Sequence, residues 1–331
     1  MLRLPWFEYR APRSVAEAAK ILAGEGPAAM LVAGGTDLLP NMKRRHQSPK
    51  VLVSLKGIEE LRRVNGSYGA GVSLAELAAR PETPAALRHA AAQVATAQIR
   101  NMATLGGNLC LDTRCTYYNQ TEEWRKAIDY CLKKDGSTCW VATASKRCVA
   151  ASSTDTAPAL IALGATVKLV GAGGEREIPV EALYNNDGID YLSRKPDEVL
   201  TGVVVPAGWK STYWKLRRRG SFDFPILGVA AAVRMEGDVV AEARLALGAV
   251  ASRPFLVEKA GAFLKGKRLT DEVIAEASTL VANRAKPMDN TDMDLYWRKE
   301  VADDFAGYAL MEVRGDDLRA VRLKTARYLP A

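Results

Sequence analysis

The stretch Leu31-Val32-Ala33-Gly34-Gly35-Thr36-Asp37-Leu38 runs from apolar residues directly into two glycines. This pattern is typical of a buried strand that ends in a tight loop, where glycine lets the backbone approach a ligand closely. Successive N–H groups in such a loop can surround an anion, and the hydroxyl and carboxylate that follow add polar contacts. The loop is neither G-x-G-x-x-G nor a P-loop, and taken alone it is equally compatible with a plain connection.

A second loop of the same kind lies about seventy residues later, as Thr104-Leu105-Gly106-Gly107-Asn108-Leu109. Beyond a polar segment follows the run Ser153-Thr154-Asp155-Thr156-Ala157-Pro158. Asp155 can cap the helix that begins there, or its carboxylate can bind a ribose hydroxyl or a ring edge. Two Gly-Gly loops with adjacent hydroxyl and carboxylate groups fit a long ligand with a pyrophosphate better than a single phosphate. The sequence therefore favours a dinucleotide site.

The length, composition and charge of the chain limit which kinds of protein it can be. The chain has 331 residues, 48% of them hydrophobic and 25% charged, which is typical of a folded protein of two or three domains. The net charge of +8 is spread along the chain, so nucleic acid is not expected as a partner. Pro5, Glu8 and Pro12 interrupt the apolar residues near the start, and no run approaches the roughly 18 that a membrane span needs. We therefore expect no membrane span and a cytoplasmic, reducing compartment.

All five cysteines lie between positions 110 and 148. Clustered cysteines in a reducing compartment more often bind metal than form disulfides. Cys115, Cys131, Cys139 and Cys148 are separated by 15, 7 and 8 residues, without a C-x-x-C pair. Four thiolates can hold either a [4Fe–4S] cluster or tetrahedral zinc, and four ordinary thiols remain an alternative. Cys110 directly follows the second Gly-Gly loop, so we expect it to be a small buried residue outside this set.

The aromatic residues of the same segment are expected to wrap and partly dry a bound group: Tyr117, Tyr118, Trp124, Tyr130 and Trp140. The two histidines, His46 and His89, are expected at the surface, because one follows three basic residues and the other lies on an Ala-rich helix. The chain carries neither G-x-S-x-G nor a histidine placed as a base, so a hydrolase is not expected. Chemistry carried by cofactors is therefore favoured.

A basic and aromatic stretch, Tyr213-Trp214-Lys215-Leu216-Arg217, reads as a strand with Lys215 on the same face as Tyr213. That face is either solvated or turned toward an anionic cofactor ring. Hydrophobic periodicity predicts the remaining elements. Capping boxes at Ser14 and Ser73 open two helices. The predicted strands lie near 28–33, 50–55, 166–170, 197–206, 227–235 and 241–250, with a hairpin at 63–72, and the predicted helices near 85–97, 255–265, 270–284 and 296–313.

These elements predict an α+β protein of two domains. Residues 111–150 are polar, aromatic and lack clear periodicity, whereas the Ala-rich pattern resumes from Thr156, so this segment reads as an insertion. The first domain is expected over 1–211, with subdomains at about 1–56 and 57–211. The second is expected over 212–331.

In the order of its motifs the chain resembles the FAD-binding medium subunits of the molybdenum hydroxylases, the xanthine dehydrogenase family. These motifs are G-G-T-D, then A-T-L-G-G-N-L, then T-D-x-x-P-A-L, then Y-x-K-x-x-R-R with an Asp four residues on. The resemblance implies a two-part FAD-binding domain and an α+β C-terminal domain. It also implies that Val32 to Asp37 and Thr104 to Asn108 hold the FAD pyrophosphate, that Asp155 contacts the cofactor, and that Leu200 and Lys215 lie near the isoalloxazine.

The insertion is similar to that of the 4-hydroxybenzoyl-CoA reductase β subunits. That similarity implies a [4Fe–4S] cluster on Cys115, Cys131, Cys139 and Cys148 in an electron-transfer subunit, with ferredoxin as donor for reductive dehydroxylation to benzoyl-CoA. It also implies a large molybdopterin subunit and a small subunit with two [2Fe–2S] clusters, paired into a dimer of heterotrimers. The alternatives are a dehydrogenase of another aromatic or CoA-thioester substrate with outward electron flow, and a zinc-stabilised binding module.

Overall fold

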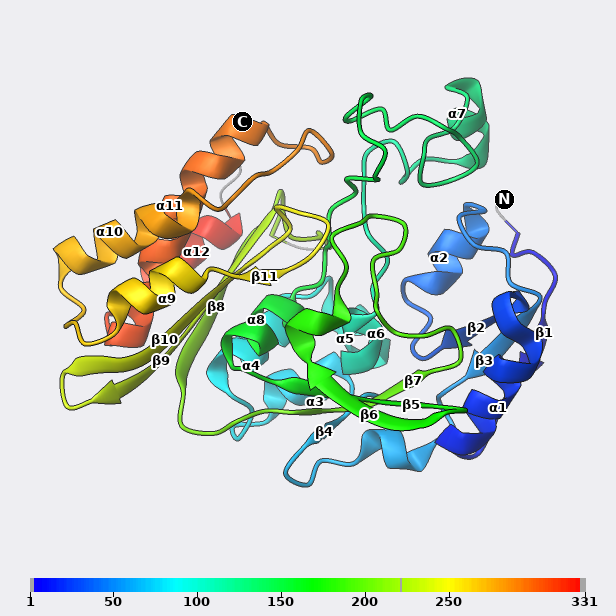
Figure 1. The fold of residues 1–331 in the computed structure, drawn as a ribbon, viewed down its shortest axis with the longest axis horizontal. Helices are drawn as coiled ribbons and strands as arrows, with labels where there is room; N and C mark the ends of the chain where they lie inside the picture. The colour runs from blue at the N-terminus through cyan, green and yellow to red at the C-terminus, as the bar shows by residue number, and fades with distance from the viewer. Residues whose placement is uncertain (1–2, 221, 328–331) are drawn as a thin grey trace.

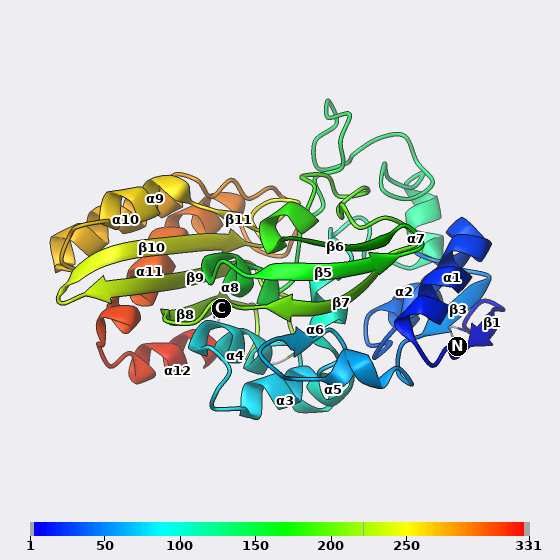
Figure 2. The same ribbon diagram turned by 60° about the horizontal axis from the view of Figure 1, so that its bottom comes forward.

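The computed structural model describes residues 3–220 and 222–327, so the outermost residues of the two predicted domains, 1–2 and 328–331, lie outside the described residues. Three sheets follow one another along the longest axis of the molecule (Figures 1 and 2). Helices pack against each of them, which confirms the α+β prediction. No helix in the described part of the chain combines the length and the apolar character needed to cross a membrane.

The N-terminal sheet is small and parallel, in the order β1-β3-β2. Its elements are β1 (Glu8–Arg10), α1 (Val15–Glu25), β2 (Ala29–Val32), α2 (Leu38–Lys43) and β3 (Val51–Ser54). Helix α1 begins where the sequence predicts, since the Ser14 hydroxyl accepts a hydrogen bond from the Glu17 N–H at 3.1 Å. Because β2 runs directly into the first Gly-Gly loop, this sheet fixes the position of that loop.

The middle part contains the antiparallel sheet β4-β7-β5-β6 and a group of short helices. Its strands are β4 (Tyr68–Gly69), β5 (Thr166–Gly171), β6 (Gly174–Pro179) and β7 (Val199–Val204). Its helices are α3 (Leu74–Ala79), α4 (Ala85–Ala92), α5 (Ala97–Met102), α6 (Leu105–Leu109) and α8 (Thr156–Ala162). Every residue of α8 is buried, because this helix packs between the middle core and the C-terminal sheet.

The C-terminal part is an antiparallel sheet in the order β11-β10-β9-β8. Its strands are β8 (Lys210–Leu216), β9 (Leu227–Glu236), β10 (Val239–Gly248) and β11 (Phe255–Leu256). Its helices are α9 (Glu258–Leu264), α10 (Asp271–Ala282), α11 (Leu295–Arg314) and α12 (Arg319–Arg327). Strand β9 has two buried faces: Ala230 and Ala232 face the middle core, whereas Val229 and Val233 face the helices. The sheet therefore joins the two parts.

The cysteine-bearing segment, which contains α7, projects from the body at the top of the view in Figure 1. Its two ends meet as a short antiparallel bridge, in which Arg114 and Ala151 exchange backbone hydrogen bonds of 2.8 and 2.7 Å. The segment contains one short helix, α7 (Glu122–Ala127), which its weak periodicity did not predict. Between the bridged ends the chain leaves and re-enters the middle part.

Two expectations about local structure are wrong. The helix expected over 85–97 ends at Ala92 as α4, and α5 begins at Ala97, because the chain turns between them at Ala95, which has a φ of 41°. The hairpin expected over 63–72 is a single bridge between Val64 and Tyr68, since β4 pairs with β7 instead. Strand β6 and helix α12 were not predicted.

Candidate functional site

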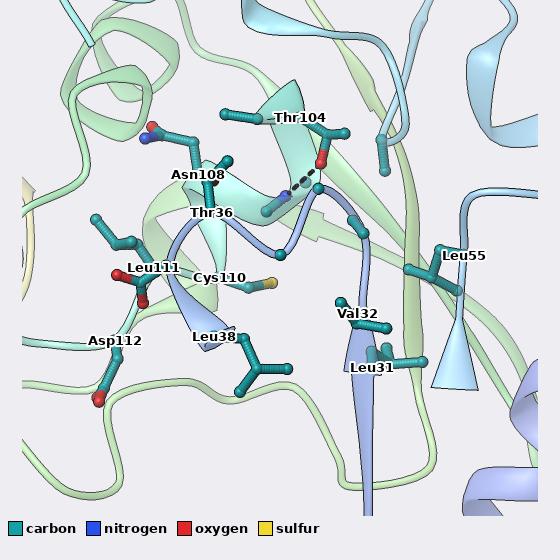
Figure 3. Close-up of a pocket in the computed structure, with 18 of the residues that line it drawn as sticks. Leu31, Val32, Thr36, Leu38, Leu55, Thr104, Asn108, Cys110, Leu111 and Asp112 are labelled. Carbon is teal, nitrogen blue, oxygen red and sulfur yellow. Dashed lines mark hydrogen bonds between the residues drawn. The ribbon is translucent and has the colours of Figure 1, made fainter. Parts of the chain in front are cut away.

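A cleft of about 730 Å³ lies where the N-terminal sheet meets the middle part. It is lined by loops from both, as Figure 3 shows for Thr36 and Thr104. Residues of the segment that follows β8, such as Phe224, complete the lining. Of the thirteen residues predicted to bind a cofactor, twelve lie in its wall: Val32, Ala33, Gly34, Gly35, Thr36, Asp37, Thr104, Gly106, Gly107, Asn108, Asp155 and Leu200. The structure therefore gathers these residues into one wall.

The first Gly-Gly loop offers backbone donors to the cleft. Within residues 3–220 and 222–327, no acceptor is found for the N–H groups of Gly34, Gly35 and Thr36. Gly35 has a φ of 68°, which favours glycine. Gly34 packs so tightly on α5 that a Cβ there would overlap the Met102 carbonyl oxygen and lie 2.6 Å from its carbon. The loop can therefore hold an anion, and only glycine fits its first position.

The second loop differs, because it forms the short helix α6 and uses its own donors. The N–H groups of Gly106 and Gly107 bond to the Ala70 carbonyl at 2.8 Å and to the Thr104 hydroxyl at 3.1 Å. Asn108 faces inward, where its Oδ1 accepts hydrogen bonds from the Thr154 hydroxyl at 2.9 Å and from Thr156, through its hydroxyl at 2.7 Å and its N–H at 3.1 Å. The second loop therefore forms part of the cleft wall with its glycine N–H groups already bonded, whereas the first loop has N–H groups available to a ligand.

Asp155 and Lys215 form a buried ion pair behind the cleft. Lys215 Nζ lies 2.9 Å from Asp155 Oδ2, and the Tyr213 hydroxyl donates to the other carboxylate oxygen at 2.8 Å. Burial raises the pKa of Asp155 and lowers that of Lys215, while the charge of each partner opposes the shift of the other. Of the two alternatives for Asp155, the side-chain cap is not found, because its carboxylate is engaged here. Of the two alternatives for Lys215, the solvated face is not found, since its side chain is fully buried.

Asp37, in the first Gly-Gly loop, is held by a hydrogen bond from Arg114, which lies at the start of the cysteine-bearing segment. The Arg114 guanidinium donates to Asp37 Oδ1 and, at 2.9 Å, to Asn41 Oδ1, while Asn41 donates to the other oxygen of Asp37 at 2.9 Å. Burial raises the pKa of Asp37, and the Arg114 charge opposes that shift. Arg114 directly precedes Cys115, so the first Gly-Gly loop and the cysteine segment are joined by this pair.

The four cysteines meet at one small cavity. Cys115, Cys131, Cys139 and Cys148 are each 5–7% exposed, and all are free thiols. Burial raises the pKa of Cys115 to about 12 and that of Cys148 to about 11, and neighbouring thiols add to each shift. The four cysteines singled out in the sequence therefore lie together in the structure. Cys110 lies apart from them, but it is half-buried in the wall of the cleft instead of fully buried as expected.

The donor set of this cavity fits a group bound by thiolates. However, its free space is about 10 Å³, roughly one water-sized sphere. In the described part of the chain, no group of three or more His, Cys, Asp or Glu side chains has the arrangement of a formed metal site. The thiols would have to move apart to hold a cluster of iron and sulfide.

The expected aromatic wrapping is only partly found. Tyr117, Tyr118 and Trp140 line the cysteine cavity, whereas Trp124 and Tyr130 do not. Trp140 is itself 39% exposed, as is Trp124, so the wrapping is open to solvent on that side. The prediction of two surface histidines is wrong. His46 is buried against the Tyr118 ring, with ring centroids 4.1 Å apart, and His89 lies 3.2 Å from the Thr212 hydroxyl. Burial lowers the pKa of both histidines to about 4.

Sequence reasoning missed four residues between the two sites: Asp112, Arg114, Lys133 and Tyr191. Asp112 and Tyr191 line the cleft, and Lys133 lines the cysteine cavity. Nothing in their local pattern marks them. The one available signal was that Asp112 and Arg114 closely precede a cysteine of the cluster.

The fold and the cleft define a flavoprotein. Residues 5–208 match the family described as the FAD binding domain in molybdopterin dehydrogenase, and residues 211–313 match the CO dehydrogenase flavoprotein C-terminal domain. The chain belongs to the family of FAD-binding medium subunits of molybdenum hydroxylases, and FAD is its cofactor. The predicted flavoprotein fold and oxidoreductase class are thereby confirmed.

Relatives of known activity cover nearly the whole chain. The aldehyde oxidoreductase FAD-binding subunit PaoB of Escherichia coli K12 is 32% identical over 85% of this chain and 93% of its own length. The carbon monoxide dehydrogenase medium chain of Hydrogenophaga pseudoflava is 29% identical over 92% of this chain and 96% of its own length. A solved structure of carbon monoxide dehydrogenase from that organism matches with a TM-score of 0.74 at 28% identity, over 93% of this chain and 97% of that one. These relatives are a subunit of an aldehyde oxidoreductase and a subunit of a carbon monoxide dehydrogenase.

Proposed function

We propose that this chain is the electron-transfer subunit of a molybdenum-dependent oxidoreductase, and that it carries a [4Fe–4S] cluster in addition to FAD. The observation that carries the proposal is the convergence of four buried cysteines, from an insertion, on one cavity beside the flavin cleft. FAD, when bound, can exchange one or two electrons, and a cluster exchanges one. The role of the chain is to hold both groups in one body and to keep water away from them.

Specific residues would hold FAD. We propose that the free N–H groups of Gly34, Gly35 and Thr36 bind its pyrophosphate, because backbone donors in a glycine loop suit a dense negative charge. We also propose that Asp155 contacts FAD and that Leu200 and the buried Lys215 lie near its isoalloxazine ring. The boundary between the two domains is proposed to lie near residue 211.

A second candidate for the cysteine cavity is a single zinc ion. The free space of about 10 Å³ favours one ion over a cluster, and four thiolates satisfy tetrahedral zinc. In that case the insertion would be a structural module without redox function. The iron–sulfur reading is preferred because the cysteine segment is joined to the flavin loop through Arg114 and Asp37.

For the reaction, we propose reductive dehydroxylation of 4-hydroxybenzoyl-CoA, on the resemblance of the insertion. The phenolic hydroxyl leaves as water when two electrons and two protons are added to the ring. Substrate would bind to a large molybdopterin subunit, and a small subunit would carry two [2Fe–2S] clusters, in a dimer of heterotrimers in the cytoplasm. Because the relatives named above are subunits of an aldehyde oxidoreductase and a carbon monoxide dehydrogenase, the alternative is oxidation of another aromatic or CoA-thioester substrate with outward electron flow.

The decisive experiment is metal, sulfide and flavin analysis of the purified complex, with a visible spectrum. We expect about four iron atoms and four acid-labile sulfides for this chain beyond those of the small subunit. Cys131→Ala should lose that iron, whereas the matched variant Cys110→Ala, in the cleft wall, should keep it. Zinc without extra iron or sulfide would contradict the proposal and favour the structural module.

The direction of electron flow and the identity of the electron donor need separate measurements. Redox titration should place the cluster at or below the flavin potential if electrons flow inward from ferredoxin. The rate of reduction by ferredoxin should fall as ionic strength rises, because the net charge of +8 favours an acidic partner. A rate without salt dependence would contradict ferredoxin docking by charge, and a cluster potential well above the flavin would favour outward flow.

A further inference from the structure

Asp112 lies between the flavin cleft and the cysteine cavity. Its side chain is 8% exposed and lines the cleft, and it comes three residues before Cys115. Its carboxylate accepts three hydrogen bonds, from Lys133 Nζ at 2.7 Å, from the Tyr118 hydroxyl at 2.9 Å and from Gln47 Nε2 at 2.9 Å. The donors come from the cysteine segment and from the chain after α2. A single carboxylate therefore ties both regions together.

Lys133 is the counterpart of Asp112 on the cysteine side. Its side chain is 6% exposed and lines the cysteine cavity, two residues after Cys131. Besides Asp112 it donates to the Thr113 hydroxyl at 2.6 Å and to the Gly188 carbonyl at 2.5 Å, so all three of its N–H groups are used. Its ammonium also lies 4.7 Å from the centre of the Tyr118 ring and 5.4 Å from that of Tyr191.

The third contact of Lys133 extends the connection to a second loop. The Gly188 N–H donates to the Cys148 carbonyl at 2.9 Å, and a Cβ at this glycine would lie 2.6 Å from Cys148 Sγ. Three residues later the same loop reaches the cleft wall at Tyr191. The loop at residues 188–191 therefore contacts the cysteine cavity through the backbone of Gly188 and the flavin cleft through Tyr191. Movement at one site would displace the wall of the other.

We propose that Asp112 and Lys133 form a positioning pair that holds the cysteine segment against the flavin cleft, and whose two buried charges set the reduction potentials of the groups bound on either side. The part concerning the cluster rests on the proposed function, whereas the part concerning FAD does not. A buried charge is poorly screened, so removing one acts strongly on a neighbouring group that gains an electron. Loss of the positive charge disfavours reduction, and loss of the negative charge favours it.

The opposite signs distinguish this electrostatic role from a merely structural one. In the purified complex we would measure the midpoint potentials of flavin and cluster for Lys133→Met, for Asp112→Asn and for the double variant. Lys133→Met should shift both potentials to more negative values and Asp112→Asn to more positive values, and the double variant should return close to the parent. Lys134→Met is the matched control, because this neighbouring lysine is 31% exposed and pairs with Asp135 at the surface. It should shift neither potential.

Several results would overturn the inference. The inference is overturned if Lys133→Met and Asp112→Asn shift the midpoint potentials in the same direction. It is also overturned if both variants keep full FAD content and have the same potentials as the control Lys134→Met. If Lys133→Met does not fold, Asp112→Asn must still lie at a more positive potential than the double variant. Absence of extra iron and sulfide from the parent complex would overturn the cluster of the proposed function, while the flavin potentials would still decide the role of the pair.

Discussion

Replacement of Gly34 by alanine should separate the first Gly-Gly loop from α5 and weaken FAD binding. The new Cβ would lie 2.6 Å from the Met102 carbonyl carbon, about 1 Å closer than carbon atoms pack. The Met102 atoms that the new Cβ meets are backbone atoms, so they cannot rotate away. The loop must therefore move by about 1 Å. Overpacking of this kind costs about 1–3 kcal/mol of folding free energy.

The substitution should weaken FAD binding as well as folding. A displaced loop would lose at least one N–H contact to the charged pyrophosphate. Hydrogen bonds to charged groups contribute about 1.5–3 kcal/mol, so each lost contact should weaken binding roughly 10- to 100-fold. Titration of the FAD-free chain with FAD, followed by flavin fluorescence, measures this Kd, and thermal unfolding without FAD measures the stability.

Gly24→Ala is the matched control, because no atom lies within 4 Å of a Cβ at this position near the end of α1. It should keep the parental Kd, and the better helix propensity of alanine should raise the stability by up to about 1 kcal/mol. A Gly34→Ala variant that binds FAD with the parental Kd would refute the reasoning, since it would show that the close packing of this loop is not needed for binding.

Three further predictions concern folding free energy, each measured by thermal or urea unfolding. Asn108→Ala should cost about 1–3 kcal/mol, since it leaves three buried donors without their acceptor; an unchanged midpoint would contradict this. Lys215→Met should cost about 3–5 kcal/mol because Asp155 keeps a buried, unpaired charge, and adding Asp155→Asn should recover part of it; a double variant less stable than the single would count against the pair. Folding requires a neutral His46, so stability is full above its unfolded pKa of 6.5 and should be lost, by up to about 3 kcal/mol, as pH falls toward 4. His46→Gln should reduce this acid sensitivity, and the same pH profile as the parent would contradict the assignment.

The sequence by itself determined those features that depend on neighbours along the chain. The caps at Ser14 and Ser73 and the first Gly-Gly loop were correctly predicted, because each is governed by a few adjacent residues. The second Gly-Gly stretch was predicted as a loop but forms the short helix α6. The grouping of four cysteines was also predictable, since the cluster is confined to one segment of an otherwise cysteine-free chain.

Only the tertiary structure decided which polar groups are buried and with what partners. The sequence left Asp155 open as a helix cap or a cofactor contact, and Lys215 as solvated or turned toward a cofactor. Neither alternative predicts that the two form an ion pair across sixty positions. Likewise, Arg114 meets Asp37 across 77 positions, and Lys133 meets Asp112 across 21. An isolated polar residue has the same local pattern whether it faces water or a distant partner. Its burial depends on how separate elements pack, and burial is what sets its charge, its pKa and its role.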